Sequence, residues 1–381
     1  MRLVQVGLRH FRNLAIQNLE IPPEGLALIG ENGQGKSNFL EALYYLEAFR
    51  SFRGAPDEQL VAAGEQAFRV STVLEGVGKR RVSAAYQPRG KRKKVTVDGA
   101  EPVRLRDALG AIGAVIFSPT DVALVSGGPA ERRRYLDIVL SLNVPGYVRT
   151  LQRYRHVLRQ RNAVLKDVGR RGGAIAALIA SGRLRPWDEG LARLGARLVI
   201  ERRAWVEEHC DAFRSLYQAV AADGHTARLR YAPGLPLADA SKTEDVEAAF
   251  RDALVRTAKG DRGPVSTDVG PHRDDLDMTF RGVAGQLAVR AFASGGQRRT
   301  AALALRLLEA RTVRDRRGCS PLMLVDDVFA ELDEGRAERA LDLLEHEDTA
   351  QVILTAPRET DVRLKRDVLP QWRITAGRIQ V

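Results

Sequence analysis

Cysteine is scarce in this chain, and long apolar segments are absent. The 381 residues include only two cysteines, Cys210 and Cys319, which lie too far apart for metal-ligand spacing. This argues against a disulfide framework or a zinc site and indicates a reducing compartment such as the cytoplasm. No apolar run is long enough for a signal peptide or a membrane span. We therefore expect a soluble, cytoplasmic protein with no membrane partner.

Acidic residues are outnumbered by basic ones. The chain has 60 lysines and arginines against 48 aspartates and glutamates, a formal net charge of +12. This excess favours a polyanionic partner, and nucleic acid ranks ahead of an anionic membrane because no basic amphipathic anchor is evident. A high-GC genome would explain the use of arginine for lysine but not the excess over acids.

A phosphate-binding loop stands near the start of the chain. Residues 26–29 are apolar, and residues 30–37 match G-x-x-x-x-G-K-[ST] ahead of a segment with a helical apolar face. The glycines let backbone N–H groups approach phosphate oxygens, Lys36 supplies a cation, and the Ser37 hydroxyl suits magnesium. We predict that a nucleoside triphosphate is bound here by Gly30, Glu31, Asn32, Gly33, Gln34, Gly35, Lys36, Ser37 and Asn38.

Two later motifs fit the same kind of site. Ser-Gly-Gly-Gln at 294–297 begins a helix, where a hydroxyl, glycine amides and the helix dipole favour an anion. The apolar run at 322–325 ends in Asp326 and Asp327, as a buried parallel strand does beside a ligand. Asp326 would hold magnesium with Ser37, and Asp327 would orient or deprotonate the attacking water. The candidate catalytic residues are thus Lys36, Asp326 and Asp327, and the second anion-binding segment is Ser294, Gly295, Gly296 and Gln297.

The middle of the chain differs from its two ends. Between about 131 and 259 strand signals almost vanish and helical periodicity dominates, with a long helix starting beside Pro186. Strand patterns return at 265–269 and in a final strand over 373–381. We predict an α/β fold with mixed sheets and an inserted, mainly α-helical arm, divided as 1–125 (N-terminal part of the head), 126–262 (arm) and 263–381 (C-terminal part of the head).

Basic residues gather in the loop after the first helix and along the first helix of the arm. A charge run on a helix is usually its solvated face, and contact with DNA is the alternative; both stay open here. The candidates for a DNA surface are Arg50, Arg53, Arg149, Arg153 and Arg159. His272 beside Asp274 and Asp275 suggests a metal, but adjacent residues of a Gly-Pro turn cannot all point at one ion, so we expect none.

The order of these features resembles the head domain of ABC-type ATPases and, more closely, the RecF family of DNA replication and repair proteins. The resemblance extends over almost the whole chain. It is carried by the phosphate loop together with Phe11-Arg12-Asn13, Phe117-Ser118-Pro119 with Asp121, residues 132–137, Gly270 to Asp275, and Leu324 to Phe329 with Glu331-Leu332-Asp333.

The resemblance implies an ATPase that uses ATP and Mg²⁺, binds DNA at duplex and single-strand junctions, and forms an ATP-dependent homodimer. It also implies cooperation with RecO and RecR in loading recombinase at single-stranded gaps during repair, recombination, replication restart and the SOS response. The 294–297 segment of one subunit would close on the nucleotide of the other, and hydrolysis would release the dimer. Arg12 would lie near the adenine and Asp333 at the dimer interface. Asp327 in place of a glutamate, and Thr355 in place of a switch histidine, imply slow turnover.

Three alternatives belong to other classes. One is an ATP-binding clamp with negligible hydrolysis, which the sequence barely separates from a slow ATPase. An SMC-like DNA organiser would need a coiled coil many heptads longer than this insert. The ATP-binding subunit of a membrane transporter would lack both the arm and the basic excess.

Overall fold

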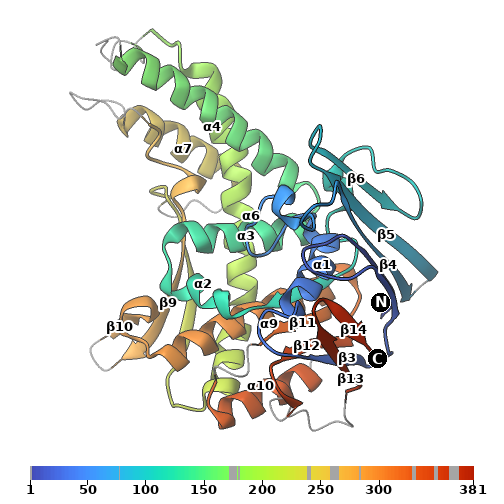
Figure 1. Cartoon of the computed structure of the whole chain (residues 1–381). Helices are drawn as coiled ribbons and strands as arrows, with labels where there is room; N and C mark the ends of the chain where they lie inside the picture. The colour runs from blue at the N-terminus through green and yellow to red at the C-terminus, as the bar shows by residue number, and fades with distance from the viewer. Residues whose placement is uncertain are drawn as a thin grey trace. The chain divides into compact units, whose positions relative to one another are not determined.

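The computed structural model describes residues 2–76, 78–170, 178, 181–237, 242–257, 266–282, 285–327, 332–346, 351–359 and 369–381. The chain forms two compact units (Figure 1). The first comprises Met1–Val122, Ser215–His225 and Ala293–Val381, and the second Ala123–Arg214 and Thr226–Phe292. No described helix is long and apolar enough to span a membrane.

A six-stranded sheet forms the base of the first unit. Its order is β14-β13-β3-β12-β11-β7, and all neighbours pair in parallel except the terminal β13–β14 hairpin. Strands β3, β7 and β11 are buried along their whole length, as their continuous apolar sequences predict. The strands are β3 (Gly25–Ile29), β7 (Ala114–Phe117), β11 (Leu322–Asp326), β12 (Gln351–Ala356), β13 (Gln371–Thr375) and β14 (Arg378–Gln380).

A five-stranded antiparallel sheet, in the order β2-β1-β4-β5-β6, forms a second layer of the first unit. Helix α1 (Lys36–Ala48) contacts strands of both sheets, and of its 13 residues only Ser37 and Asn38 are not buried. Phe68 packs edge-on against Phe11 and Tyr45 in the core that α1 shares with this sheet. The strands are β1 (Arg2–Arg9), β2 (Gln17–Glu20), β4 (Phe68–Gly76), β5 (Gly78–Gln87) and β6 (Arg92–Val97).

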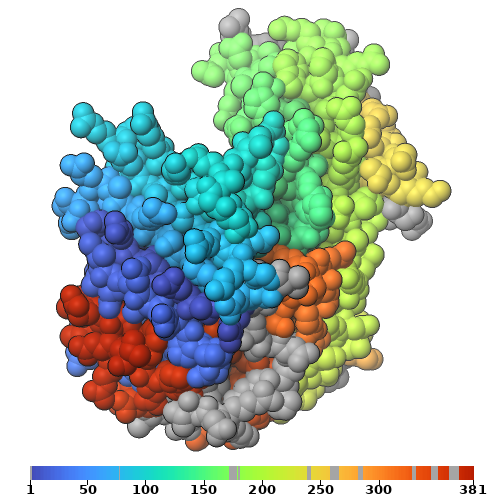
Figure 2. Space-filling view, turned by 90° about the vertical axis from the view of Figure 1, so that its right-hand side faces the viewer, coloured from blue at the N-terminus to red at the C-terminus, as the bar shows by residue number. Residues whose placement is uncertain are grey.

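Both ends of the chain contribute to the first unit. Figure 2 shows the N-terminal surface in blue next to the C-terminal surface in red. The two are joined where β13 pairs with β3 and where the Ala15 N–H donates to the Gly377 carbonyl at 2.9 Å. The predicted single strand over 373–381 is wrong, because Ala376 and Gly377 take left-handed φ angles of 47° and 77° and turn the chain into a hairpin. The unit also contains η1 (Asp57–Leu60), η2 (Leu105–Ala108), η3 (Pro119–Asp121), α9 (Gly295–Arg317) and α10 (Glu334–His346).

Long helices dominate the second unit, as predicted. The helix expected beside Pro186 is α6 (Arg185–Ala221), which belongs to this unit through Arg214; its 37 residues extend about 55 Å at 1.5 Å per residue. The other helices are α2 (Val122–Ser126), α3 (Pro129–Asn143), α4 (Tyr147–Arg170), α7 (Thr243–Thr257) and α8 (Val289–Phe292), with η4 at Pro271–Arg273. The turn expected at 169–173 lies mostly outside the described residues.

A three-stranded antiparallel sheet completes the second unit, and two predictions fail here. Its order is β10-β9-β8, with β8 at Ala227–Ala232, β9 at Asp275–Gly282 and β10 at Gly285–Ala288. Strand β8 was not expected within the helical middle, although its residues alternate between buried and exposed. The strand expected at 265–269 does not form over 266–269, because the Thr267 N–H donates to the Asn162 side chain at 2.9 Å instead of to a neighbouring strand.

The two compact units divide the chain differently from the predicted segments 1–125, 126–262 and 263–381. Residues 266–292 were grouped with the head, but they belong to the second unit because β9 pairs with β8. Residues 215–225, which fell within the arm segment, belong to the first unit. The functional domain boundaries themselves stay a prediction.

Candidate nucleotide site

The phosphate loop leaves β3 at Ile29 and enters α1 at Lys36. Gly33 and Gly35 have φ angles of 82° and 115°, which only glycine adopts at little cost. The Lys36 side chain is 4% exposed, and its Nζ donates to the carbonyls of Gly30 at 2.7 Å and Glu31 at 3.3 Å. The ammonium is thus turned back over the loop, where it would meet a bound phosphate.

The loop is supported from two distant parts of the chain. The Ala376 N–H donates to Gln34 Oε1 at 2.6 Å, and the Gly377 N–H donates to the Gln34 carbonyl at 2.9 Å. Asn13 Nδ2 donates to the Gly33 carbonyl at 3.3 Å. The side-chain carbonyl of Gln34, a predicted ligand residue, therefore holds the C-terminal hairpin. Sequence reasoning missed this hairpin, although Gly377 was a signal of the tight turn.

The two predicted carboxylates lie at the carboxyl end of β11. Asp326 is paired in register with Thr355 of β12. The Thr355 hydroxyl lies 3.1 Å from Asp326 Oδ1 and 3.2 Å from Asp327 Oδ1, and it accepts from the Asp327 N–H at 3.1 Å. Asp327 Oδ2 lies 3.8 Å from Lys36 Nζ. The tertiary fold therefore brings Lys36, Asp326 and Asp327 together, with Thr355 between the carboxylates.

The electrostatics of Asp326 suit a cation. Burial raises its pKa above the ordinary 3.8, and the charge of Asp327 adds to this, whereas a hydrogen bond with the Ser37 hydroxyl and the charge of Arg53 oppose it. Asp327 has a φ of 48°, a conformation that non-glycine residues adopt rarely and that often occurs at functional sites. A divalent ion beside Asp326 and Ser37 would offset this accumulated negative charge.

Two arginines flank the loop and share one buried carboxylate. Arg12 donates to Glu41 from Nε at 3.0 Å and from Nη2 at 3.2 Å, and Glu41 is fully buried in α1. Arg53 Nη1 donates to Asn38 Oδ1 at 3.0 Å and lies 3.9 Å from Glu41. The structure places the DNA candidate Arg53 beside the nucleotide loop, and its contact with DNA stays a prediction. Arg50, exposed in the same loop, stays a DNA candidate.

The 294–297 segment forms the N-terminus of α9. Ser294 and Gln297 make reciprocal capping bonds: Ser294 Oγ accepts from the Gln297 N–H at 3.2 Å, and the Ser294 N–H donates to Gln297 Oε1 at 2.9 Å. Gln297 Nε2 donates to Asp223 at 3.1 Å, and Asp223 lies 3.5 Å from Arg336. Ser294 and Gly295 remain exposed. Asp223 and Arg336 were not foreseen, because no local pattern connects them with this helix.

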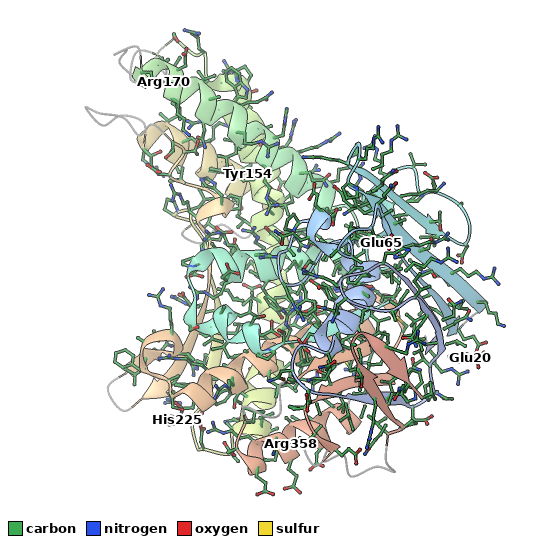
Figure 3. The ribbon with its side chains drawn as sticks, viewed as in Figure 1. Glu20, Glu65, Tyr154, Arg170, His225 and Arg358 are labelled. Carbon is green, nitrogen blue, oxygen red and sulfur yellow. The ribbon has the colours of Figure 1, made fainter. Side chains whose placement is uncertain are left out.

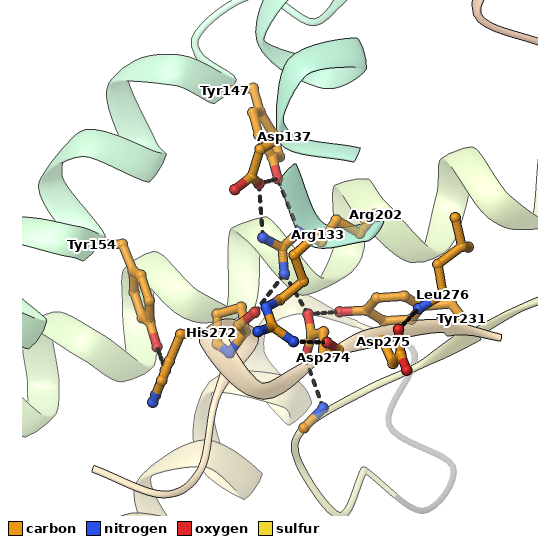
Figure 4. A network of polar contacts seen from close by, with 12 residues as sticks. Arg133, Asp137, Tyr147, Tyr154, Arg202, Tyr231, His272, Asp274, Asp275 and Leu276 are labelled. Carbon is orange, nitrogen blue, oxygen red and sulfur yellow. Dashed lines mark hydrogen bonds and ion pairs between the residues drawn. The ribbon is translucent and has the colours of Figure 1, made fainter. Parts of the chain in front are cut away.

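Two of the family-like segments instead build a buried polar network in the second unit (Figure 4). Arg202, 2% exposed, donates to Asp137 at 2.7 Å, to Asp274 at 2.6 Å and to the Tyr147 hydroxyl at 3.0 Å. The Tyr231 hydroxyl also donates to Asp274. Arg202 thus joins segment 132–137 to Gly270–Asp275. Both segments serve the packing of this unit, and the described residues contain no cluster of three or more histidines, cysteines, aspartates or glutamates placed to hold a metal ion.

His272 is part of the same structure. Its Nδ1 lies 2.7 Å from the Tyr154 hydroxyl and its Nε2 lies 2.8 Å from the Thr267 carbonyl. Burial lowers the pKa of His272 below its ordinary value. Both ring nitrogens of His272 therefore have hydrogen-bond partners within this unit.

The arginines of α4 divide between two roles. Arg161 is buried, donating to Asp188 at 2.6 Å and to Thr267 at 2.9 Å, and Arg155 donates to Asp137 at 2.8 Å. The predicted DNA candidates Arg149, Arg153 and Arg159 are exposed. Tyr154 and Arg170, labelled in Figure 3, mark the middle and the end of this helix.

Comparison with known proteins identifies the family. The family model described as RecF/RecN/SMC N terminal domain matches residues 2–371. A DNA replication and repair protein RecF from Cyanothece sp. is 36% identical over 357 residues, which cover 93% of this chain and 91% of that protein. The chain belongs to the RecF family. The RecF of Salinibacter ruber is likewise 36% identical, over 94% of this chain and 85% of its own length.

Solved structures agree with RecF membership. One described as the recombination mediator protein RecF-ATP in RecFOR pathway has a TM-score of 0.87 and 29% identity, covering 100% of this chain and 97% of that chain. The Smc head domain of Pyrococcus furiosus, with a TM-score of 0.55 and 15% identity, shares the fold. The expected α/β head of ABC type is confirmed, and this member of the RecF family is an ATP-hydrolysing protein of DNA replication and repair. Of the motif residues, Val328, Phe329 and Glu331 lie outside the described part of the chain.

Proposed function

We propose that the phosphate loop binds ATP and that Asp326 and Ser37 hold the accompanying Mg²⁺. The carrying observation is the position of Lys36, whose ammonium is buried against loop carbonyls 3.8 Å from Asp327. The solved relative described as RecF-ATP supports the choice of nucleotide. Carboxylate and hydroxyl oxygens are the donors that Mg²⁺ prefers, and the raised pKa of buried Asp326 marks a carboxylate that a cation would stabilise.

Each residue has a role that follows from its position. Mg²⁺, when bound, supplies charge stabilisation for phosphoryl transfer. Lys36 exchanges its carbonyl contacts for phosphate oxygens, and Asp327 orients the attacking water. The Thr355 hydroxyl has one proton for two carboxylates and keeps both at the end of β11. Hydrolysis is slow, because Asp327 already interacts with Thr355 and Lys36.

ATP also joins two copies of the chain. Ser294 and Gly295 are exposed at the start of α9, while Gln297 and Asp223 fix the direction of that helix N-terminus. An exposed, fixed helix N-terminus suits the γ-phosphate of a nucleotide held by a second copy. Asp333, whose side chain is 63% exposed, would lie at the same interface, and Arg12 would lie near the adenine.

The ATP-bound dimer acts on DNA in the cytoplasm. DNA at duplex and single-strand junctions promotes the dimer and stimulates its weak ATPase, and RecO and RecR act with it in loading recombinase and in the SOS response. The family, the net charge of +12 and the RecFOR pathway named for a solved relative support this assignment. The second candidate function is an ATP-binding clamp with negligible hydrolysis. The contacts of the Asp327 carboxylate with Thr355 and Lys36 favour this candidate, because they engage the group that would orient the attacking water.

Sedimentation velocity with ATP and Mg²⁺, with and without a gapped duplex, tests the proposal. The wild type should dimerise with ATP, and more readily with DNA. The Ser294→Arg variant should stay monomeric. The control is Ser181→Arg, which adds the same charge at an exposed residue of the second unit and should dimerise normally. A wild type that stays monomeric throughout contradicts the composite site.

The rate of phosphate release separates the two candidates. Lys36→Met should lower the DNA-stimulated rate to background, because the transferred phosphate loses its cation. Equal, negligible rates in both proteins while the wild type still binds ATP would leave only the clamp.

A further inference from the structure

One line of short side chains crosses the five-stranded sheet of the first unit. The strand registers place one residue from each strand directly opposite the next, which puts all five on the same face. On the alternate positions, Val6, Val70 and Val82 are buried toward α1, so the line lies on the outer face. In strand order the line is Asn18, Gly7, Ser71, Ser83 and Thr96.

The line forms the floor of a depression of about 370 Å³, which we call the transverse trough. Gly7 keeps the floor low, because a Cβ there would lie 2.6 Å from Ser71 Oγ and 3.0 Å from Asn18 Oδ1. Ser83 and Thr96 share a hydrogen bond of 2.7 Å between their hydroxyls. The floor therefore consists of hydroxyl and amide groups, with no aromatic side chain among the lining residues.

Arginines stand on both sides of the trough. Arg69 and Arg81 line it from the two neighbouring rows of the sheet, and both are exposed. No acidic side chain in the described part of the chain lies within 4.0 Å of either guanidinium. Arg9 is directly opposite Arg69 in the β1–β4 register. Like charges placed opposite each other destabilise a sheet, and a bound anion would remove that repulsion.

Three of the nearby acids are already hydrogen-bonded or ion-paired with other groups, whereas Glu20, opposite Gln5 on β2, is exposed. Glu75 is bound to Arg2 at 2.8 Å, and Glu101 is bound to Lys94 at 2.7 Å. Asp98 accepts from the Arg81 backbone N–H at 2.7 Å. The positive charge beside the trough is thus only partly balanced.

We infer that the transverse trough binds the sugar–phosphate backbone of double-stranded DNA; this inference rests on the proposed action on DNA. Guanidinium, hydroxyl and amide groups are those that contact phosphate and sugar without reading sequence. The absence of aromatic lining residues argues against single strands, which are gripped by stacking. Five strands at about 4.8 Å span about 19 Å, enough for about three successive phosphates of one strand.

Fluorescence anisotropy with the full chain, ATP, Mg²⁺ and a labelled blunt duplex tests the trough over 50 to 200 mM salt. Arg69→Gln with Arg81→Gln removes two cations, so the slope of log K against log[salt] should fall by about 2. The wild type should then lose about tenfold more affinity than the variant over this range. Ser71→Leu fills the trough without changing charge and should weaken binding several-fold.

Arg80→Gln is the matched control, since Arg80 neighbours Arg81 on β5 but belongs to the opposite face. It should bind DNA like the wild type, and all variants should bind a fluorescent ATP analogue normally. Wild-type binding that none of the trough variants weakens overturns the trough and leaves the proposed function intact. A wild type that binds no duplex at any salt overturns both.

Discussion

Replacing Arg202 with methionine should destabilise the second unit severely while leaving the nucleotide site intact. Arg202 is 2% exposed, and it neutralises Asp137 and Asp274, which are also buried. Removing one partner of a buried ion pair costs about 3–5 kcal/mol, because the remaining charge stays buried without compensation. Asp274 loses its ion-pair partner, whereas Asp137 keeps the exposed Arg155 at 2.8 Å, so we expect a loss of about 3–5 kcal/mol in the free energy of unfolding.

Urea unfolding followed by tryptophan fluorescence is a suitable assay, because Trp205 is buried in this unit. The loss should shrink as the pH falls, since an unpaired buried carboxyl is stable only when protonated. Combining Arg202→Met with Asp137→Asn and Asp274→Asn should recover most of the loss. Arg214→Met, on the same helix but in an exposed pair with Asp211, should change stability by less than about 0.5 kcal/mol.

The opposite result is equally informative. If Arg202→Met unfolds like the wild type but fails to bind ATP at low temperature, the network serves the reaction and not the packing. Segments 132–137 and Gly270–Asp275 would then have a role in nucleotide binding and not only in packing.

Three further predictions concern the head. Thr355→Val should lower kcat about tenfold and leave the affinity for ATP nearly unchanged. The reason is that Asp327 loses one hydrogen bond, worth ~1.4 kcal/mol, and is no longer held in the orientation that catalysis needs. Single-turnover kinetics measure this effect. Because the pKa of Asp326 is raised in the folded protein, the metal-free protein should lose stability as the pH rises from about 3.8 through that raised pKa. Asp326→Asn should abolish this loss, which thermal melts without Mg²⁺ measure. Asp223→Asn should weaken the ATP-dependent dimer about tenfold, since Gln297 loses a charged acceptor; sedimentation equilibrium measures this.

The phosphate loop could be predicted from sequence because its parts are contiguous. A strand, two positive-φ glycines and the start of a helix lie within a dozen residues, so local chemistry decides their arrangement. The buried strand ending at Asp326 was predictable for the same reason. The supports of the site were not, since Gln34 and Ala376 are separated by 342 residues and meet only because β13 pairs with β3.

The arginines show most clearly which features follow from the sequence alone and which follow only from the tertiary structure. Sequence by itself determined the fold class, the phosphate loop, the helix start at residues 294–297 and the excess of positive charge, because these depend on local pattern and composition. Only the tertiary structure decided that Arg161 is a buried partner of Asp188, that Arg53 adjoins the loop and that Arg69 borders a trough. The physical reason is that an arginine's role depends on which carboxylate, if any, packs against it. That pairing is set by strand register and helix packing between segments far apart in the chain.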